Sequence, residues 1–76
     1  MSLPLKRPNP DDWIDRIFAA KAAQTGGVVR RDVSWVAREI GEDRLIDEVR
    51  RRGFHMIRAG GQFIVICNAG GIQIVV

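Results

Sequence analysis

The sequence predicts an α+β fold in which three helices, with a short strand after the first, precede a C-terminal three-stranded antiparallel meander. Residues 54–76 predict the meander, because runs rich in Ile, Val and Phe alternate there with two Gly-Gly pairs suited to tight hairpins. Residues 9–52 predict the helices, because apolar residues recur at helical spacing between start and stop signals. We assign residues 9–76 to one domain and residues 1–8 to a flexible N-terminal tail.

The first helix is predicted from Pro10 to about Gln24. Asn9 is a suitable cap, proline suits the first helical position, and Asp11 and Asp12 favour the positive end of the helix dipole. Gly26 and the glycine after it end this helix. The next four residues, 28–31, are β-branched or charged and too few for a helix, so they predict a short strand.

Two further helices follow this strand. Asp32 is placed to cap the first of them, whose apolar residues share one buried face and which ends at Gly41. The other is predicted over about residues 43–52, with Gly53 as its stop signal. The expected buried residues of the two helices are Val33, Val36, Ala37, Ile40, Leu45, Ile46 and Val49.

Turn geometry predicts the register of the meander. A two-residue turn at Gly60-Gly61 pairs Arg58 with Phe63, and a second turn at Ala69-Gly70 pairs Cys67 with Ile72. Side chains then alternate between the two faces of the sheet. The expected inner face comprises Phe54, Met56, Phe63, Val65, Cys67, Ile72, Ile74 and Val76, and the expected outer face comprises His55, Ile57, Ile64, Ile66, Gln73 and Val75.

The outer face of this meander predicts self-association. Monomeric proteins rarely leave so contiguous an apolar patch in water, and a chain of 76 residues buries only about 60 to 65% of its unfolded surface. Trp35 lies off the buried stripe of its helix, so either the first helix or the N-terminal tail covers it, or it anchors an interface. The predicted interface residues of this homo-oligomer are Trp35, His55, Ile57, Ile64, Ile66 and Val75.

Charge suggests a second kind of surface. Twelve basic residues against nine acidic ones give a net charge of +3, and arginine suits phosphate because it donates two parallel hydrogen bonds. Several arginines follow an acid at i, i+4, as Arg52 follows Glu48, which also fits a solvated salt-bridged face. The arginines without an evident local partner are the predicted nucleic-acid-binding residues: Arg30, Arg31, Arg50 and Arg58.

Several classes of function are disfavoured by the residues present. On the predicted register His55 and Cys67 point to opposite sides of the sheet, so no catalytic residue is predicted and the chain is not expected to be an enzyme. One cysteine and one histidine cannot form a structural zinc site, and no cofactor is expected. No run approaches the roughly 20 apolar residues of a membrane span, and no signal peptide is evident. We therefore expect a soluble, cytoplasmic protein without a membrane or metal partner.

The element order resembles that of the winged-helix family. The likeness is carried by residues 28–31 as the first strand, residues 32–41 and 42–52 as a helix-turn-helix pair, and residues 54–67 as the wing. It implies DNA binding, with the second helix of the pair in the major groove and base edges read mainly from its N-terminal part. The chain departs from the family in its additional strand at residues 72–76 and in the acids Glu42, Asp43, Asp47 and Glu48 on that helix.

The segments G-G-V-V-R-R and G-Q-F-I-V-I-C-N are also similar to those of short bacterial proteins labelled phosphoribosylanthranilate isomerase. A barrel enzyme of that kind needs roughly 200 residues or more, so this likeness implies no such activity here. Two hypotheses follow from the sequence. The first is a small homo-oligomeric winged-helix-like protein that binds DNA, and the alternative is a homodimeric protein-interaction module that binds no nucleic acid.

Overall fold

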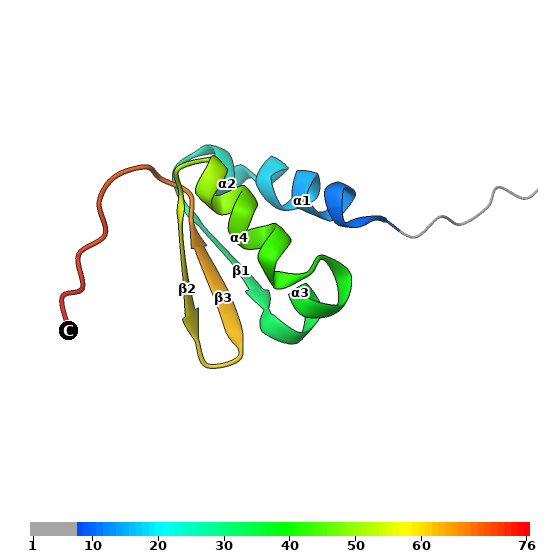
Figure 1. Cartoon of the computed structure of the whole chain (residues 1–76). Helices are drawn as coiled ribbons and strands as arrows, with labels where there is room; N and C mark the ends of the chain where they lie inside the picture. The colour runs from blue at the N-terminus through cyan, green and yellow to red at the C-terminus, as the bar shows by residue number, and fades with distance from the viewer. Residues whose placement is uncertain (1–7) are drawn as a thin grey trace, which may run out of the picture.

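The structure, a computed structural model, describes residues 8–76, and it confirms the predicted α+β class. Most of the predicted N-terminal tail, residues 1–7, lies outside the described residues. Over the described part of the chain there are four helices and one three-stranded antiparallel sheet (Figure 1). The elements are α1 (Pro10–Ala19), α2 (Lys21–Gln24), β1 (Val28–Asp32), α3 (Val33–Glu39), α4 (Glu42–Arg51), β2 (His55–Ala59) and β3 (Gln62–Ile66).

Helix α1 begins as predicted but ends early. The side chain of Asn9 accepts a hydrogen bond from the Asp12 backbone N–H at 2.8 Å, and the Asp12 carboxylate accepts one from the Asn9 N–H at 3.2 Å, which completes a capping box. The predicted continuous helix to Gln24 is wrong, because Ala20 is extended and separates α1 from α2. Helix α2 packs against β1 and buries Ala23, so tertiary packing overrides the helical preference of this alanine-rich stretch.

Helices α3 and α4 form the predicted pair, joined at Gly41. This glycine has a φ of +93°, a conformation that other residues rarely adopt. Asp32 stands at the N-cap position of α3 but makes no side-chain capping hydrogen bond. Ala37, predicted in the buried stripe, is exposed. The core combines residues of α1, α3, α4 and the sheet, and its most deeply buried members are Ile14, Ile17, Val36, Leu45 and Val65.

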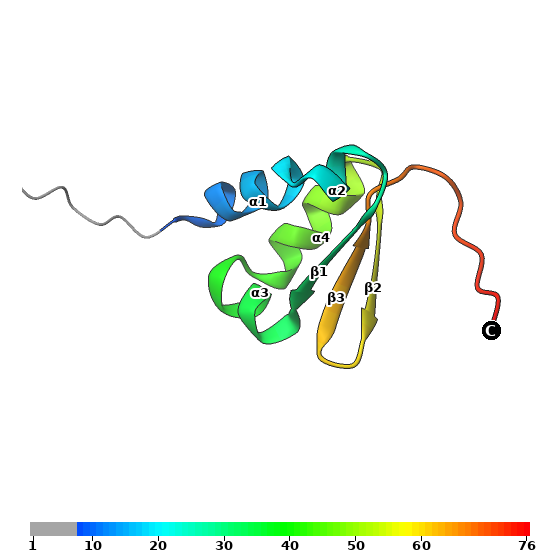
Figure 2. The same ribbon diagram turned by 180° about the vertical axis from the view of Figure 1, so that it is seen from behind.

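The sheet has the order β1-β3-β2, as Figure 2 shows from behind. The predicted register of the β2–β3 hairpin is confirmed, since Arg58 pairs with Phe63 and Met56 with Val65. The predicted third meander strand at residues 72–76 is wrong, because this segment is in no strand. Strand β1 takes the edge of β3 that the meander needed, since Val65 pairs there with Val29 rather than with Ile74. A strand has only two edges, so β3 has no place for a third partner.

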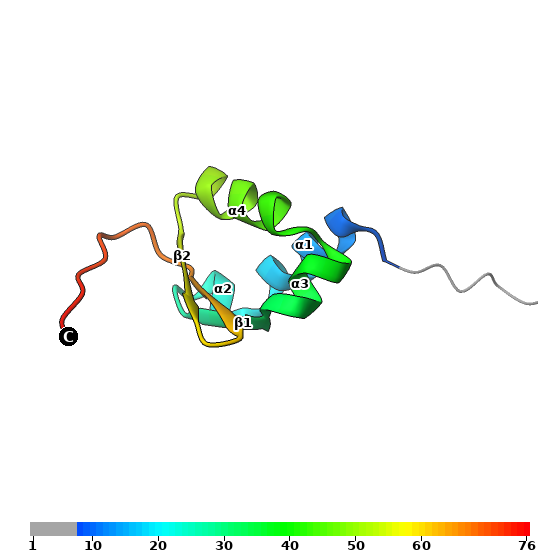
Figure 3. The same ribbon diagram turned by 60° about the horizontal axis from the view of Figure 1, so that its bottom comes forward.

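The two faces of the sheet differ as the register predicts. Phe63, Val65 and Cys67 are buried on the inner face, and Figure 3 shows the helical layer on one side of the sheet. On the outer face Ile57 is 46% exposed, and Ile64 and Ile66 are half-buried. The C-terminal segment after Cys67 leaves this body and is exposed along its length (Figures 1 and 2).

Candidate functional site

A buried carboxylate on α4 organises one group of arginines. Glu48 is 3% exposed and accepts hydrogen bonds from Arg44 at 3.1 Å, from Arg52 at 2.8 Å and from Arg51. Arg44 also donates to Asp11 at 3.0 Å, which joins α4 to α1. The predicted Glu48–Arg52 pair is therefore present. Arg51 also pairs with Glu48, and not with Asp47, the acid four residues before it. We call these residues, Arg44, Glu48, Arg51 and Arg52, the Glu48 cluster.

The Glu48 cluster shifts the pKa values of its members. Burial alone would raise the pKa of Glu48, but hydrogen bonds from Arg51, Arg44 and Arg52 outweigh it and hold this pKa below its ordinary value. The hydrogen bonds that Arg44 donates to Asp11 and Glu48 raise the pKa of Arg44. The guanidinium carbon of Arg52 also lies 4.2 Å from the ring centroid of Phe18, so this side chain covers the core as well. The cluster is a structural support of α4, because three arginines bond the buried Glu48 carboxylate.

Two of the predicted nucleic-acid-binding arginines lie on either side of one phenylalanine. Arg31 on β1 and Arg58 on β2 are both cross-strand partners of Phe63 on β3, so all three belong to one row on the inner face. The row lies beside the hairpin turn, where Phe63 is buried, Arg31 is half-buried and Arg58 is exposed. Arg58 lies 6.0 Å from the Phe63 ring centroid, and the Arg31 side chain donates to the Arg30 carbonyl at 2.6 Å. We call Arg31 and Arg58 the hairpin arginines.

The other two predicted arginines lie elsewhere. Arg30 is on the outer face, in the row of Ile64 and Ile57, and Arg50 is exposed on α4. Within residues 8–76, no acid forms a salt bridge with any of the four predicted arginines. The structure thus places Arg31 and Arg58 in one row of the sheet. Arg30 and Arg31, which are neighbours in sequence, lie on opposite faces.

The predicted interface residues fall into three places. His55, Ile57, Ile64 and Ile66 share the outer face, together with Val28, which is 45% exposed and which sequence reasoning did not include. The strand β1 had no assigned partner in the sequence, so the position of Val28 beside Ile66 could not be foreseen. The remaining two predicted residues, Trp35 and Val75, lie away from this face.

Trp35 is half-buried against α1. Its ring meets Trp13 edge to face, with centroids 5.0 Å apart and an interplanar angle of 76°. The first helix therefore covers Trp35, which is one of the interpretations that the sequence left open. The indole N–H of Trp13 is buried and has no hydrogen-bond partner among the described residues. Val75 belongs to the exposed C-terminal segment and to no sheet.

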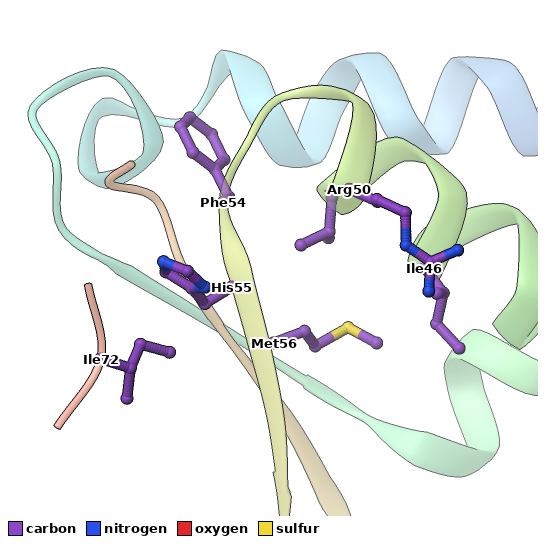
Figure 4. Close-up of a pocket in the computed structure, with 7 residues that line it drawn as sticks. Ile46, Arg50, Phe54, His55, Met56 and Ile72 are labelled. Atoms are coloured by element: carbon purple, nitrogen blue, oxygen red, sulfur yellow. The ribbon is translucent and has the colours of Figure 1, made fainter. Parts of the chain in front are cut away.

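A groove of about 410 Å³ lies beside β2 (Figure 4). Figure 4 shows His55 and Ile72 on one side of the strand, and Met56, Arg50 and Ile46 on the other. The His55 Nε2 donates to the Gly70 carbonyl at 2.6 Å, and the Gly70 N–H donates to the Asn68 side chain at 2.6 Å. These bonds hold the start of the C-terminal segment against the outer-face side of β2.

The chemistry available to these residues is limited. Cys67 is buried, and burial raises the pKa of its thiol despite the opposing charge of Arg52. His55 lies on the other face, as the register predicts, so it does not reach this thiol. The described part of the chain contains no cluster of three or more residues able to hold a metal ion. Among residues 8–76, no helix is long and apolar enough to cross a membrane.

No protein-family model matches the chain, and neither the curated proteins nor the solved structures contain a match.

Proposed function

We propose that this chain is a winged-helix-like domain that binds duplex DNA through the phosphate backbone, with the hairpin arginines as its principal contacts. The observation that carries the proposal is their arrangement: Arg31 and Arg58 come from the two outer strands, lie on either side of Phe63, and form no salt bridge with a described acid. Arginines without an acid partner are available to phosphate oxygens, which they contact bidentately.

Two further features support this proposal. The helix pair α3–α4 directly precedes the β2–β3 hairpin, in the order on which the winged-helix resemblance rests. Moreover, Glu48, one of the four acids on α4 that oppose DNA binding, is buried and neutralised by arginines. Asp43 and Asp47 remain exposed on α4. They would repel phosphates, so the proposal assigns the main contacts to the hairpin and not to α4.

A salt series with arbitrary duplex DNA tests this proposal. A protein that neutralises phosphates loses affinity linearly in log K against log salt, and each lost contact reduces the slope by roughly 0.9. We expect Arg31→Glu and Arg58→Glu each to weaken binding and to flatten the slope. Arg30→Glu is the matched control, because it makes the same charge change one residue away on the opposite face. Equal effects of Arg30→Glu and Arg31→Glu, with unchanged circular dichroism, would contradict the proposal.

A homodimeric protein-interaction module is the second candidate function. It is favoured by the outer sheet face, where Val28 and Ile57 are each nearly half exposed beside Ile64 and Ile66. Val28→Lys places a charge at the β1 end of this face without touching the core. If the outer face joins two copies, sedimentation should find the variant monomeric and the parent chain dimeric. A parent chain that is itself monomeric, or a variant that remains dimeric, counts against this candidate.

A further inference from the structure

The two edges of the sheet are not equivalent. In a two-residue hairpin of this register, the main-chain groups of His55, Ile57 and Ala59 face β3, so those of Met56 and Arg58 face the free edge of β2. On the opposite edge, the Arg31 side chain covers the Arg30 carbonyl of β1. Charged side chains on an edge discourage the addition of another strand. Strand β2 also carries Arg58, but among the described residues no side chain bonds the outward main-chain groups of Met56 and Arg58, so β2 is the edge that remains open to an added strand.

The groove runs along this open edge and has walls of different chemistry. On the α4 side it is lined by Ile46 and Met56, both apolar, and by Arg50 at its rim (Figure 4). On the outer side it is lined by Ile72 and by the polar ring of His55. An added strand would place alternate side chains on the two walls. The groove thus fits a strand with aliphatic residues at every second position.

Residues 73–76 of the chain have this pattern. Ile74 is 87% exposed, Val75 is 86% exposed and Val76 is fully exposed, and the segment has no charge and three β-branched residues. Ile74 and Val76 alternate with Gln73 and Val75, so a strand formed here would offer two aliphatic side chains to the α4 wall, and Gln73 and Val75 to the side of His55 and Ile72. An uncovered segment of this composition pairs readily with an exposed strand edge.

We propose that residues 73–76 of a second copy of this chain add to the free edge of β2, and that the two copies exchange these segments reciprocally. Main-chain hydrogen bonds to Met56 and Arg58 would hold the segment, and Ile74 would enter the groove between Ile46 and Met56. Each copy carries both a groove and a segment, as a twofold dimer requires. This proposal concerns a different surface from the outer-face dimer, and it does not depend on DNA binding.

The occupant is a second copy because the chain's own segment is held elsewhere. The His55–Gly70 hydrogen bond places Ile72 on the outer-face side of β2, where it forms a wall of the groove and leaves the edge open. From there the segment continues away from the body (Figures 1 and 2). Within one chain it would have to cross the end of β2 and pair with it in parallel, and parallel pairing is less stable per residue.

Sedimentation of the whole chain and of matched variants tests this exchange. We expect the parent chain to dimerise, a truncation after Ile72 to be monomeric, and both to retain helical circular dichroism. The truncation keeps the His55–Gly70 bond and the Ile72 wall. Ile74→Lys should raise the dimer Kd about tenfold or more, because it sets a charge against Ile46 and Met56. Gln73→Lys is the control, since it adds the same charge on the polar side and should leave the dimer intact.

Disulfide trapping decides between exchange and folding back. In a Cys67→Ala background, Met56→Cys chains mixed with Ile74→Cys chains should form a mixed disulfide, and the double variant should form disulfides between chains at micromolar concentration. A monomeric parent chain would overturn the proposal, as would a dimer that survives the truncation. A dimer abolished by Val28→Lys but not by Ile74→Lys, or a disulfide formed only within one chain, would also overturn it.

Discussion

The Glu48 cluster and the hairpin arginines use the same side chain in two different environments. In the cluster, Arg44, Arg51 and Arg52 surround a carboxylate that is 3% exposed, and their hydrogen bonds fix α4 and, through Asp11, connect it to α1. At the hairpin, the arginines have Phe63 between them and form no salt bridge with an acid of residues 8–76. An arginine bonded to this buried carboxylate supports the fold, whereas we propose that an arginine without an acid partner is available to a ligand.

The largest effect is expected from Glu48→Gln. The amide accepts fewer hydrogen bonds and carries no charge, so the cluster loses charge-assisted bonds in a buried place. Loss of one partner of a buried ion pair costs about 3–5 kcal/mol, but these arginines reach solvent and can rehydrate, so we expect a loss of about 2–3 kcal/mol. Urea unfolding of the parent chain and of the variant measures this loss of unfolding free energy. Asp47→Asn, an exposed neighbour with the same chemical change, is the control and should stay within about 0.5 kcal/mol. Equal losses in the two variants would remove the distinction between the two environments.

The pH dependence of stability should come partly from the same residue. The pKa of Glu48 is lower in the folded state than its ordinary value of 4.5, so its contribution is present above that value. It is lost as pH falls below about 4.5 and through the folded-state pKa, because protonation then breaks the arginine bonds. The difference in unfolding free energy between the parent chain and Glu48→Gln should therefore shrink in acid. A difference that stays constant from neutral pH to acid would contradict this assignment.

Local signals predicted the parts of the fold that depend on neighbours in sequence. The Asn9 cap, the helix pair around Gly41 and the register of the Gly60-Gly61 hairpin could all be read from a few adjacent residues. The pairing of β1 with β3 joins residues far apart, such as Val29 and Val65, and no local pattern indicates it. The predicted strand at residues 72–76 failed for this reason, since its composition favours a strand but its expected partner edge was already occupied.

In the candidate site, too, the sequence predicted the features that depend on neighbouring residues and missed those that depend on distant ones. The sequence correctly separated His55 from Cys67, because alternation along paired strands depends only on the hairpin register. It could not place Arg31 and Arg58 on either side of Phe63, since that arrangement requires β1 to pair with β3. It also could not find the burial of Glu48, because the pattern of acids and arginines on α4 suits an exposed face equally well. The connection of Arg44 to Asp11, 33 residues away, depends on the packing of α1 against α4.

Within the Glu48 cluster the arginines should differ in effect. The Arg52 side chain is 32% exposed, binds Glu48 at 2.8 Å and covers the Phe18 ring, whereas that of Arg51 is 69% exposed. We expect Arg52→Ala to cost about 1 kcal/mol through the lost bond and the lost ring contact. Arg51→Ala should cost less than about 0.5 kcal/mol, because the Arg51 side chain is largely exposed and Glu48 keeps its bonds from Arg44 and Arg52. The two urea midpoints provide the comparison, and a larger loss for Arg51→Ala would refute the proposed order.

The smallest effect on stability is expected from Arg58→Gln, which at the same time should have a clear effect on binding. Arg58 is exposed, and its 6.0 Å approach to Phe63 is a weak contact, so the unfolding free energy should change by less than about 0.5 kcal/mol. The same substitution removes one proposed phosphate contact, so the slope of log K against log salt for duplex DNA should fall by roughly 0.9. Arg30→Gln on the outer face should change neither the unfolding free energy nor the salt slope.

A variant Arg58→Gln that unfolds much more easily and binds DNA unchanged would place Arg58 with the supporting arginines. An arginine that leaves stability unchanged and weakens binding is instead available to a partner, which is the distinction drawn between the hairpin arginines and the Glu48 cluster.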